Sequence, residues 1–225
     1  MKKLSFLLYL LPVLGILSFY PSNFRGDGQP FRRDGRPFRR DGRPFRGDGL
    51  PIGSVLPKPE IQVKDVSGKE ISLGQAKGEN GLLVMFTCNT CPYVVRNQQR
   101  TREICGYAAD RKIGVMLLNA NEGDRNGGNS FEEMRAYAKA QSYNWYYAMD
   151  EKSVLADAFG ASRTPECYLF DKSGKLVYHG AIDDSPGDPQ QVKRHHLQAA
   201  IDETLSGKEV SVKETRSVGC SINRG

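Results

Sequence analysis

The pattern of hydrophobic and polar residues predicts a series of short strands and helices. Residues 61–65 alternate between apolar and polar with a period of two, a Ser-Gly pair follows, and residues 70–73 resume the alternation. This pattern predicts a β-hairpin. Residues 82–86 and 113–118 are continuous apolar runs, which are typical of strands covered on both faces.

Stretches with helical periodicity separate these strands. Residues 93–109 follow the first apolar run and residues 131–141 follow the second, with Ser130 as N-cap and two Glu residues in the first turn. Residues 143–147 lead into a third strand, and a short helix is predicted over 153–159. Strands over 166–170 and 175–181 and a closing helix over 194–205 complete the predicted elements. This order predicts one α/β domain over residues 55–225, with a mixed sheet and helices on both faces.

The first 24 residues have the layout of an export signal. Lys2 and Lys3 precede an apolar run over residues 4–20, which contains a Pro and is followed by an incomplete cleavage site. The run is short for a membrane-spanning helix, which needs about 20 residues. We therefore expect residues 1–24 to be a signal peptide or a retained N-terminal anchor, and the rest of the chain to act outside the cytoplasm, in a periplasm or secreted.

Residues 25–54 form a low-complexity linker. Residues 27–54 repeat with a period of seven (DGQPFRR, DGRPFRR, DGRPFRG, DGLPIGS), and each unit contains both Gly and Pro. A helix is excluded because Pro costs a helix interior about 3 kcal/mol. Two interpretations stay open: a solvated spacer, or a segment whose Arg and Phe side chains associate with an anionic membrane or polysaccharide.

The charge distribution argues against a nucleic-acid partner. The chain has 32 basic and 26 acidic residues, a formal charge of +6. The excess comes from the two Lys residues of the leader and from residues 25–49, which hold eight Arg and four Asp, so residues 50–225 keep 22 of each sign. The domain therefore has no net charge with which to attract a polyanion.

The composition also allows a folded domain, since a hydrophobic content of 39% is sufficient for a globular core.

The candidate chemistry is a pair of cysteines between a buried strand and a helix. Cys88 and Cys91 form a C-x-x-C motif, and Pro92 suits a first helical turn. Two thiols three positions apart on one turn can form a disulfide, and a helix N-terminus favours the thiolate of Cys88. A second signal is Thr164-Pro165, immediately before the strand predicted at 166–170.

These motifs resemble the peroxiredoxin-like branch of the thioredoxin superfamily, within the alkyl hydroperoxide reductase and thiol-specific antioxidant group. The resemblance covers residues 53–222 and is carried by residues 86–93 (FTCNTCPY), 168–175, 182–185 and 219–222 (GCSI). It implies a thioredoxin fold, Cys88 as the attacking thiol, Cys91 as the resolving thiol and Pro165 as a cis proline that faces them. We expect the two sulfur atoms to meet at the surface, with Thr164 holding the extended backbone of a partner.

The chain departs from the peroxidase pattern of that group, in which a Thr and a remote Arg activate the peroxide. When Cys91 is aligned on the peroxidatic Cys, Cys88 occupies the Thr position and Val84 the Pro position. The Arg position is occupied by Pro165, although Arg163 is near. These departures favour disulfide exchange over peroxide reduction.

The three other cysteines and the histidines are less direct candidates for the chemistry. Cys105 and Cys167 are predicted to be buried structural thiols, whereas Cys220 is a candidate accessory thiol that pairs with or resolves the active pair. One C-x-x-C lacks the second pair that a structural zinc site needs. A copper-handling protein of this fold would use the Cys pair with a distant His, for which His179 is the candidate.

We therefore expect an oxidoreductase that exchanges disulfides with proteins or small thiols, needs no cofactor or metal, and works with a reducing or oxidising partner. Two alternatives stay open. The first is a peroxiredoxin-like thiol peroxidase, and the second is a binding or copper-handling module on the same fold.

Overall fold

A computed structural model describes residues 49–225. The predicted leader over residues 1–24 and most of the repeat linker over 25–54 lie outside the described residues. Within residues 49–225, no helix is long and apolar enough to cross a membrane.

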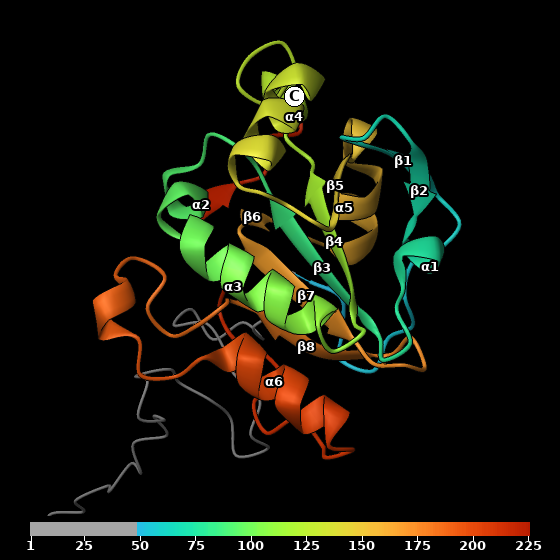
Figure 1. Ribbon diagram of the computed structural model, residues 1–225, viewed down its shortest axis with the longest axis vertical. Helices are drawn as coiled ribbons and strands as arrows, with labels where there is room; N and C mark the ends of the chain where they lie inside the picture. The colour runs from blue at the N-terminus through green and yellow to red at the C-terminus, as the bar shows by residue number, and fades with distance from the viewer. Residues whose placement is uncertain (1–48) are drawn as a thin grey trace, which may run out of the picture. The chain divides into compact units, whose positions relative to one another are not determined.

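The described chain contains nine strands and six α-helices (Figure 1). The strands are β1 (Gln62–Asp65), β2 (Glu70–Ser72), β3 (Leu82–Thr87), β4 (Gly114–Asn119), β5 (Tyr146–Met149), β6 (Arg163–Thr164), β7 (Glu166–Phe170), β8 (Leu176–Gly180) and β9 (Cys220–Ser221). The helices are α1 (Leu73–Ala76), α2 (Pro92–Arg96), α3 (Gln98–Ala109), α4 (Phe131–Ala140), α5 (Val154–Phe159) and α6 (His196–Leu205).

Seven strands form one mixed sheet in the order β2-β1-β5-β4-β3-β7-β8. β3 pairs in parallel with β4, and β4 with β5, because helices cross over between them. β3 pairs antiparallel with β7, and β7 with β8. The predicted α/β class, mixed sheet and N-terminal β1–β2 hairpin are confirmed.

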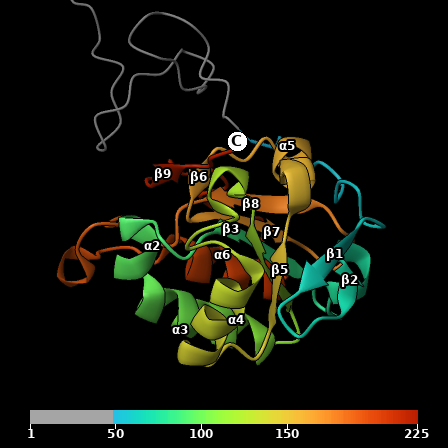
Figure 2. The ribbon, with the colours of Figure 1, turned by 90° about the horizontal axis from the view of Figure 1, so that it is seen from above.

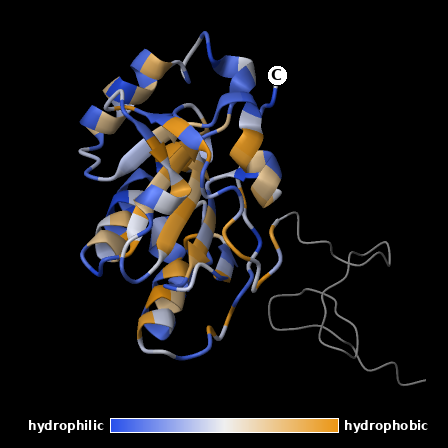
Figure 3. Cartoon of the chain, turned by 90° about the vertical axis from the view of Figure 1, so that its right-hand side faces the viewer, coloured by the Kyte–Doolittle hydropathy of each residue, from blue (hydrophilic) through white to orange (hydrophobic). Residues whose placement is uncertain are grey.

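The sheet lies between two hydrophobic clusters. Apolar side chains of α3, α4 and α6 pack on one face and those of α1 and α5 on the other. Figure 2 shows α3 and α4 on one side of the strands and α5 on the other, and Figure 3 shows that hydrophobic residues are concentrated in the central strands. All six residues of β3 are buried, as its continuous apolar run predicts.

The helix predicted over residues 93–109 is two helices. Asn97 lies between the end of α2 and the start of α3, and its ψ of 2° departs from helical geometry. The side chain of Asn97 is buried and its Nδ2 donates to the carbonyls of Tyr93 (2.7 Å) and Pro186 (3.0 Å). The bond to Pro186 joins the helix break to a loop far along the chain. The periodicity of residues 93–109 therefore does not reveal the break.

The folded region begins before Val55, the predicted domain boundary. Leu50 and Ile52 pack against the cluster formed by α1, α5 and the sheet. The Gly53 amide also donates to the Leu176 carbonyl at 2.8 Å. The last repeat unit differs from the others in carrying Leu and Ile, and these apolar side chains are the ones that join the domain.

Candidate active site

The cysteine loop leaves the buried strand β3 and enters the short helix α2. β3 ends at Thr87, Cys88 follows it, and Cys91 is the N-cap of α2 with an extended backbone (φ −68°, ψ 124°). The expectation that both cysteines share the first helical turn is therefore wrong. Cys91 is the thiol next to the helix, and Cys88 lies in the loop before it.

A buried amide holds this loop in place. Asn129 is fully buried, and its Oδ1 accepts from the Asn89 amide (2.9 Å) and from Asn119 Nδ2 (2.8 Å). Its Nδ2 donates to Thr90 Oγ1 (3.1 Å) and Asp124 Oδ2 (2.7 Å). The two residues between the cysteines are thus bonded to the polar loop that follows β4, which draws them away from helical geometry.

Two further side chains complete this network. Tyr147 on β5 donates its hydroxyl to Asn89 Oδ1 at 2.7 Å, and Asn119 Nδ2 donates to the same hydroxyl at 3.1 Å. The Arg125 guanidinium donates to Asn119 Oδ1 at 3.1 Å. Burial raises the pKa of the Tyr147 phenol well above its usual range, so it remains a neutral donor. These positioning residues were missed because their spacing matches no motif; the only signal was the Asn-rich character of residues 119–129.

Thr164 is the residue that both active-site sulfurs approach. The Thr164–Pro165 peptide bond is cis, as the resemblance implied for Pro165. Cys88 Sγ lies 3.5 Å from Thr164 Oγ1, and Cys91 Sγ lies 3.3 Å from the Thr164 carbonyl oxygen. The structure therefore brings Cys88, Cys91, Thr164 and Pro165 together, although more than 70 residues separate the two halves.

The disulfide differs from the expected pairing. Cys91 is bonded to Cys220, and Cys88 is a free thiol. The reason is that β9 pairs antiparallel with β6 and sets Cys220 opposite Thr164. The expectation that the thiol pair is open to solvent is also wrong for this state, since Cys88 is 1% exposed and Cys91 4%. Cys220 was predicted either to pair with the active cysteines or to resolve their disulfide, and in this structure it is paired with Cys91.

The two remaining cysteines are structural, as predicted. Cys105 on α3 and Cys167 on β7 are fully buried in the cluster beneath α3, α4 and α6. Burial raises the pKa of both thiols well above their usual range. Neither is poised as a thiolate nucleophile.

His179 belongs to a buried pair next to the cis proline. Its Nε2 lies 2.7 Å from Glu166 Oε1, and its ring stacks on Tyr168 with centroids 4.3 Å apart. Glu166 Oε2 accepts from the amides of Ser162 and Arg163, both at 2.9 Å, which fixes the turn that precedes Pro165. Among residues 49–225, no group of three or more His, Cys, Asp or Glu side chains could hold a metal ion.

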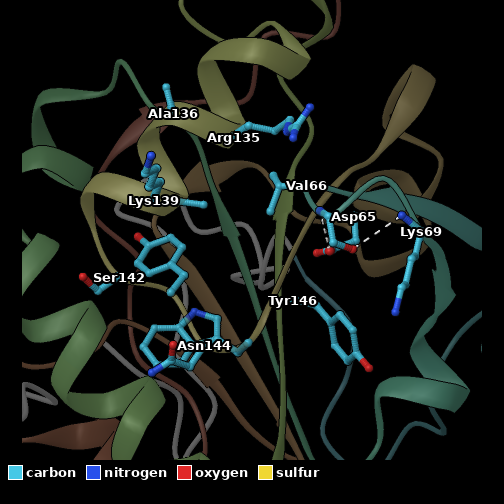
Figure 4. A pocket seen from close by; sticks show the side chains of 13 residues that line it. Asp65, Val66, Lys69, Arg135, Ala136, Lys139, Ser142, Asn144 and Tyr146 are labelled. Atoms are coloured by element: carbon cyan, nitrogen blue, oxygen red, sulfur yellow. Dashed lines mark hydrogen bonds between the residues drawn. The ribbon is translucent and has the colours of Figure 1, made fainter.

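A separate hollow of about 860 Å³ lies between the β1–β2 turn and α4 (Figure 4). It is lined by aromatic residues that include Tyr143 and Trp145 and by the basic residues Lys69, Arg135 and Lys139. No cysteine lines this hollow, so it is not part of the thiol site.

Comparisons with known proteins show what this chain is similar to. The AhpC/TSA family profile matches residues 54–179. A hypothetical protein from Sinorhizobium meliloti 1021 is 32% identical, with a TM-score of 0.69 over 77% of this chain and 96% of its own. An uncharacterized conserved protein from Geobacillus kaustophilus is 31% identical, with a TM-score of 0.71 over 77% and 92%.

A thioredoxin-like protein in the oxidized form is 18% identical, with a TM-score of 0.52 over 72% of this chain and 99% of its own. At that identity the likeness concerns the fold alone, and it confirms the predicted thioredoxin fold. No curated protein matches the chain. From the family match over residues 54–179, the chain belongs to the AhpC/TSA family.

Proposed function

We propose that this protein is a thiol–disulfide oxidoreductase that exchanges disulfides with proteins or small thiols through Cys88 and Cys91. Membership of the AhpC/TSA family makes it an oxidoreductase with thiol chemistry. The observation that carries the finer proposal is the approach of both sulfurs to Thr164, at 3.5 Å and 3.3 Å, beside the cis Thr164–Pro165 bond.

In the proposed reaction, the Cys88 thiolate attacks one sulfur of a partner disulfide. A bond forms between Cys88 and that sulfur, and the second partner sulfur leaves as a thiolate. The Cys91 thiolate then attacks Cys88 Sγ and releases the first partner sulfur. The partner has gained two electrons, the Cys88–Cys91 pair has lost them, and an external dithiol restores the pair.

The surroundings of Cys88 support its role as the attacking thiol. It is the one free cysteine at this site within residues 49–225, and the Thr164 hydroxyl at 3.5 Å can donate to its thiolate. Thr164 also lies on β6, where an extended partner backbone could pair in place of β9, which occupies that edge in this state.

Exchange is favoured over peroxide reduction because Arg163, the neighbour of Thr164, and Arg125, in the network around the cysteine loop, are both bonded to other groups. The Arg163 guanidinium donates to Ser221 Oγ at 2.9 Å. The Arg125 guanidinium is bonded to Asn119 and to the Asp150 carbonyl. Action outside the cytoplasm is part of the proposal and rests on the signal-like composition of residues 1–24.

Trapping of the mixed disulfide tests the proposal. We expect the reduced full-length protein to catalyse the reduction of insulin by dithiothreitol. Cys91→Ser combined with Cys220→Ser should leave a stable adduct on Cys88 when oxidised glutathione is added, because both thiols that could release it are gone. Cys88→Ser should abolish catalysis, and the matched core variant Cys105→Ala should retain it.

Two results would reject the assignment. Adducts that form equally well after loss of Cys88 would exclude it as the attacking thiol. Rapid consumption of hydrogen peroxide by the reduced protein, without insulin reduction, would instead establish the thiol peroxidase.

A further inference from the structure

The C-terminal arm, defined as residues 219–224, occupies the strand edge beside the cis proline. β9 pairs antiparallel with β6, so that Thr164 faces Cys220 and Arg163 faces Ser221. In Figure 1 the red C-terminal strand lies beside α2. The arm therefore combines a backbone paired at Thr164 with a cysteine bonded to Cys91. A disulfide-bearing partner would pair at the same strand edge, although its mixed disulfide would form with Cys88 and not with Cys91.

The sequence of the arm lets its backbone approach Thr164 closely at Gly219 and anchors the arm in the hydrophobic core at Ile222. A Cβ atom at Gly219 would lie 2.0 Å from the Thr164 carbonyl oxygen, so a larger residue would push the arm away. Beyond Cys220, Ile222 is buried in the cluster beneath α5, and its amide donates to the Ser162 carbonyl at 3.0 Å. Cys220 itself stays half-buried between these two points.

Polar contacts fasten the end of the arm. The Asn223 amide donates to Asn121 Oδ1 at 3.0 Å. The Arg224 guanidinium donates to the Ala161 carbonyl at 2.7 Å and to Asp157 Oδ1 at 2.8 Å. The arm is thus fastened after Cys220 and paired with β6 at Cys220 itself, which keeps that thiol next to Cys91.

We propose that the C-terminal arm is a built-in partner strand and that Cys220 is a third redox-active thiol. It accepts the disulfide from the Cys88–Cys91 pair after each exchange. This inference rests on the proposed exchange at Cys88 and Cys91.

The transfer is an isomerisation without net oxidation. The Cys220 thiolate attacks Cys91 Sγ in the Cys88–Cys91 disulfide. The Cys91–Cys220 bond forms, the Cys88–Cys91 bond breaks, and Cys88 leaves as a thiolate that takes up a proton. An external dithiol then supplies two electrons and two protons to reduce Cys91–Cys220. The structure corresponds to the state before that last step, with Cys88 free.

The arm also controls access to the site. While Cys220 is bonded to Cys91, the edge at Thr164 is filled and the cysteines are 1% and 4% exposed. A partner can pair there only after reduction has released the arm. The oxidised protein is therefore closed to further disulfide substrates until the external dithiol has acted.

Mapping of disulfides during oxidation tests the inference. The reduced full-length protein is mixed with one equivalent of oxidised glutathione, quenched at intervals, alkylated, and analysed by peptide mass spectrometry. We expect Cys88–Cys91 first, and at equilibrium about a tenfold or larger excess of Cys91–Cys220, since the free energy of about one hydrogen bond suffices for that ratio. Gly219→Ala should lower the excess about tenfold, whereas Gly187→Ala, whose added Cβ meets no atom within 4 Å, should not change it.

The outcomes separate this inference from the proposed function. If Cys88–Cys91 persists while Cys220 is alkylated and insulin is reduced normally, the exchange function stands and the role of Cys220 is refuted. If Cys91–Cys220 remains intact throughout insulin reduction, the bond is structural and the inference again fails. If neither the wild type nor Cys220→Ser reduces insulin, the proposed function itself fails. Continued insulin reduction by Cys220→Ser, with Cys88–Cys91 as its disulfide, supports the proposed function, and passage of the wild-type disulfide from Cys88–Cys91 to Cys91–Cys220 supports the inference.

Discussion

At the scale of single residues, Asn129 decides where the cysteine loop lies. It is fully buried and bonds to four groups, two of which belong to the residues between the cysteines. A buried polar group that loses its partner costs about 1–3 kcal/mol. Removal of this amide would leave the Asn89 amide without its acceptor.

We therefore predict that Asn129→Ala lowers the free energy of unfolding by about 1–3 kcal/mol and slows disulfide exchange, because the loop that carries Cys88 and Cys91 loses its anchor. Urea unfolding and insulin reduction measure the two effects. The matched control is Asn144→Ala at an exposed position, expected within about 0.5 kcal/mol of wild type. Equal behaviour of the two variants would refute the anchoring role.

Some of the site residues could be predicted from the sequence and others could not. Cys88 and Cys91 are visible in the sequence because their chemistry depends on local spacing. Thr164 and Pro165 are visible because the resemblance to the thioredoxin superfamily implies a cis proline immediately before this strand. Asn129 and Tyr147 could not be found in this way, since their importance arises only where the cysteine loop meets β5 and the loop that follows β4.

At the scale of elements, the start of α5 depends on a buried carboxylate. Asp150 is 1% exposed, and its oxygens accept from the amides of Leu155 (2.9 Å) and Ala156 (2.8 Å). Burial raises the pKa of Asp150 above its ordinary value, and the two amides oppose that shift only in part. The folded protein therefore binds a proton at this carboxyl more readily than the unfolded chain does.

This shift gives a pH dependence of known sign. A raised folded-state pKa contributes stability that is fully present below the unfolded pKa and is lost as the pH rises through the folded pKa. We predict that the free energy of unfolding of wild type, relative to Asp150→Asn, increases as the pH falls from 7 towards the ordinary carboxyl range. Urea unfolding of both proteins at each pH measures the difference between their free energies of unfolding. The contributions of the other titrating groups are the same in both proteins and cancel in this difference. A difference that does not vary with pH would contradict the assignment.

The elements also show where a sequence pattern is insufficient. The strands β3, β4 and β7 follow from apolar runs, because each is buried on both faces. β6 and β9 contain two residues each and carry no such pattern. Their pairing depends on two distant segments meeting beside the cis proline, so no local rule predicts it.

At the scale of the whole molecule, the Cys91–Cys220 bond links residues 129 positions apart. A disulfide stabilises mainly by restricting the unfolded chain, and a loop of this length corresponds to about 4–5 kcal/mol. The bond also fastens the C-terminal arm to the domain, so its reduction is expected to affect the whole fold.

We predict that reduction of the wild type lowers the free energy of unfolding by about 3–5 kcal/mol, as measured by urea unfolding with and without dithiothreitol. In Cys220→Ser this long-range bond is absent, and dithiothreitol should have a much smaller effect. The core variant Cys105→Ala should behave like wild type. An equally large effect in Cys220→Ser would show that another bond carries the stabilisation.

The α/β class, the succession of strands and helices along the chain, and Cys88 and Cys91 as candidate thiols could all be predicted from the sequence, because they depend on local periodicity and spacing. The pairing of Cys220 with Cys91, the free thiol of Cys88 and the anchoring of the loop by Asn129 became visible only in the folded chain. The physical reason is distance along the chain: these contacts join segments that approach one another only after the sheet and its crossing helices have formed.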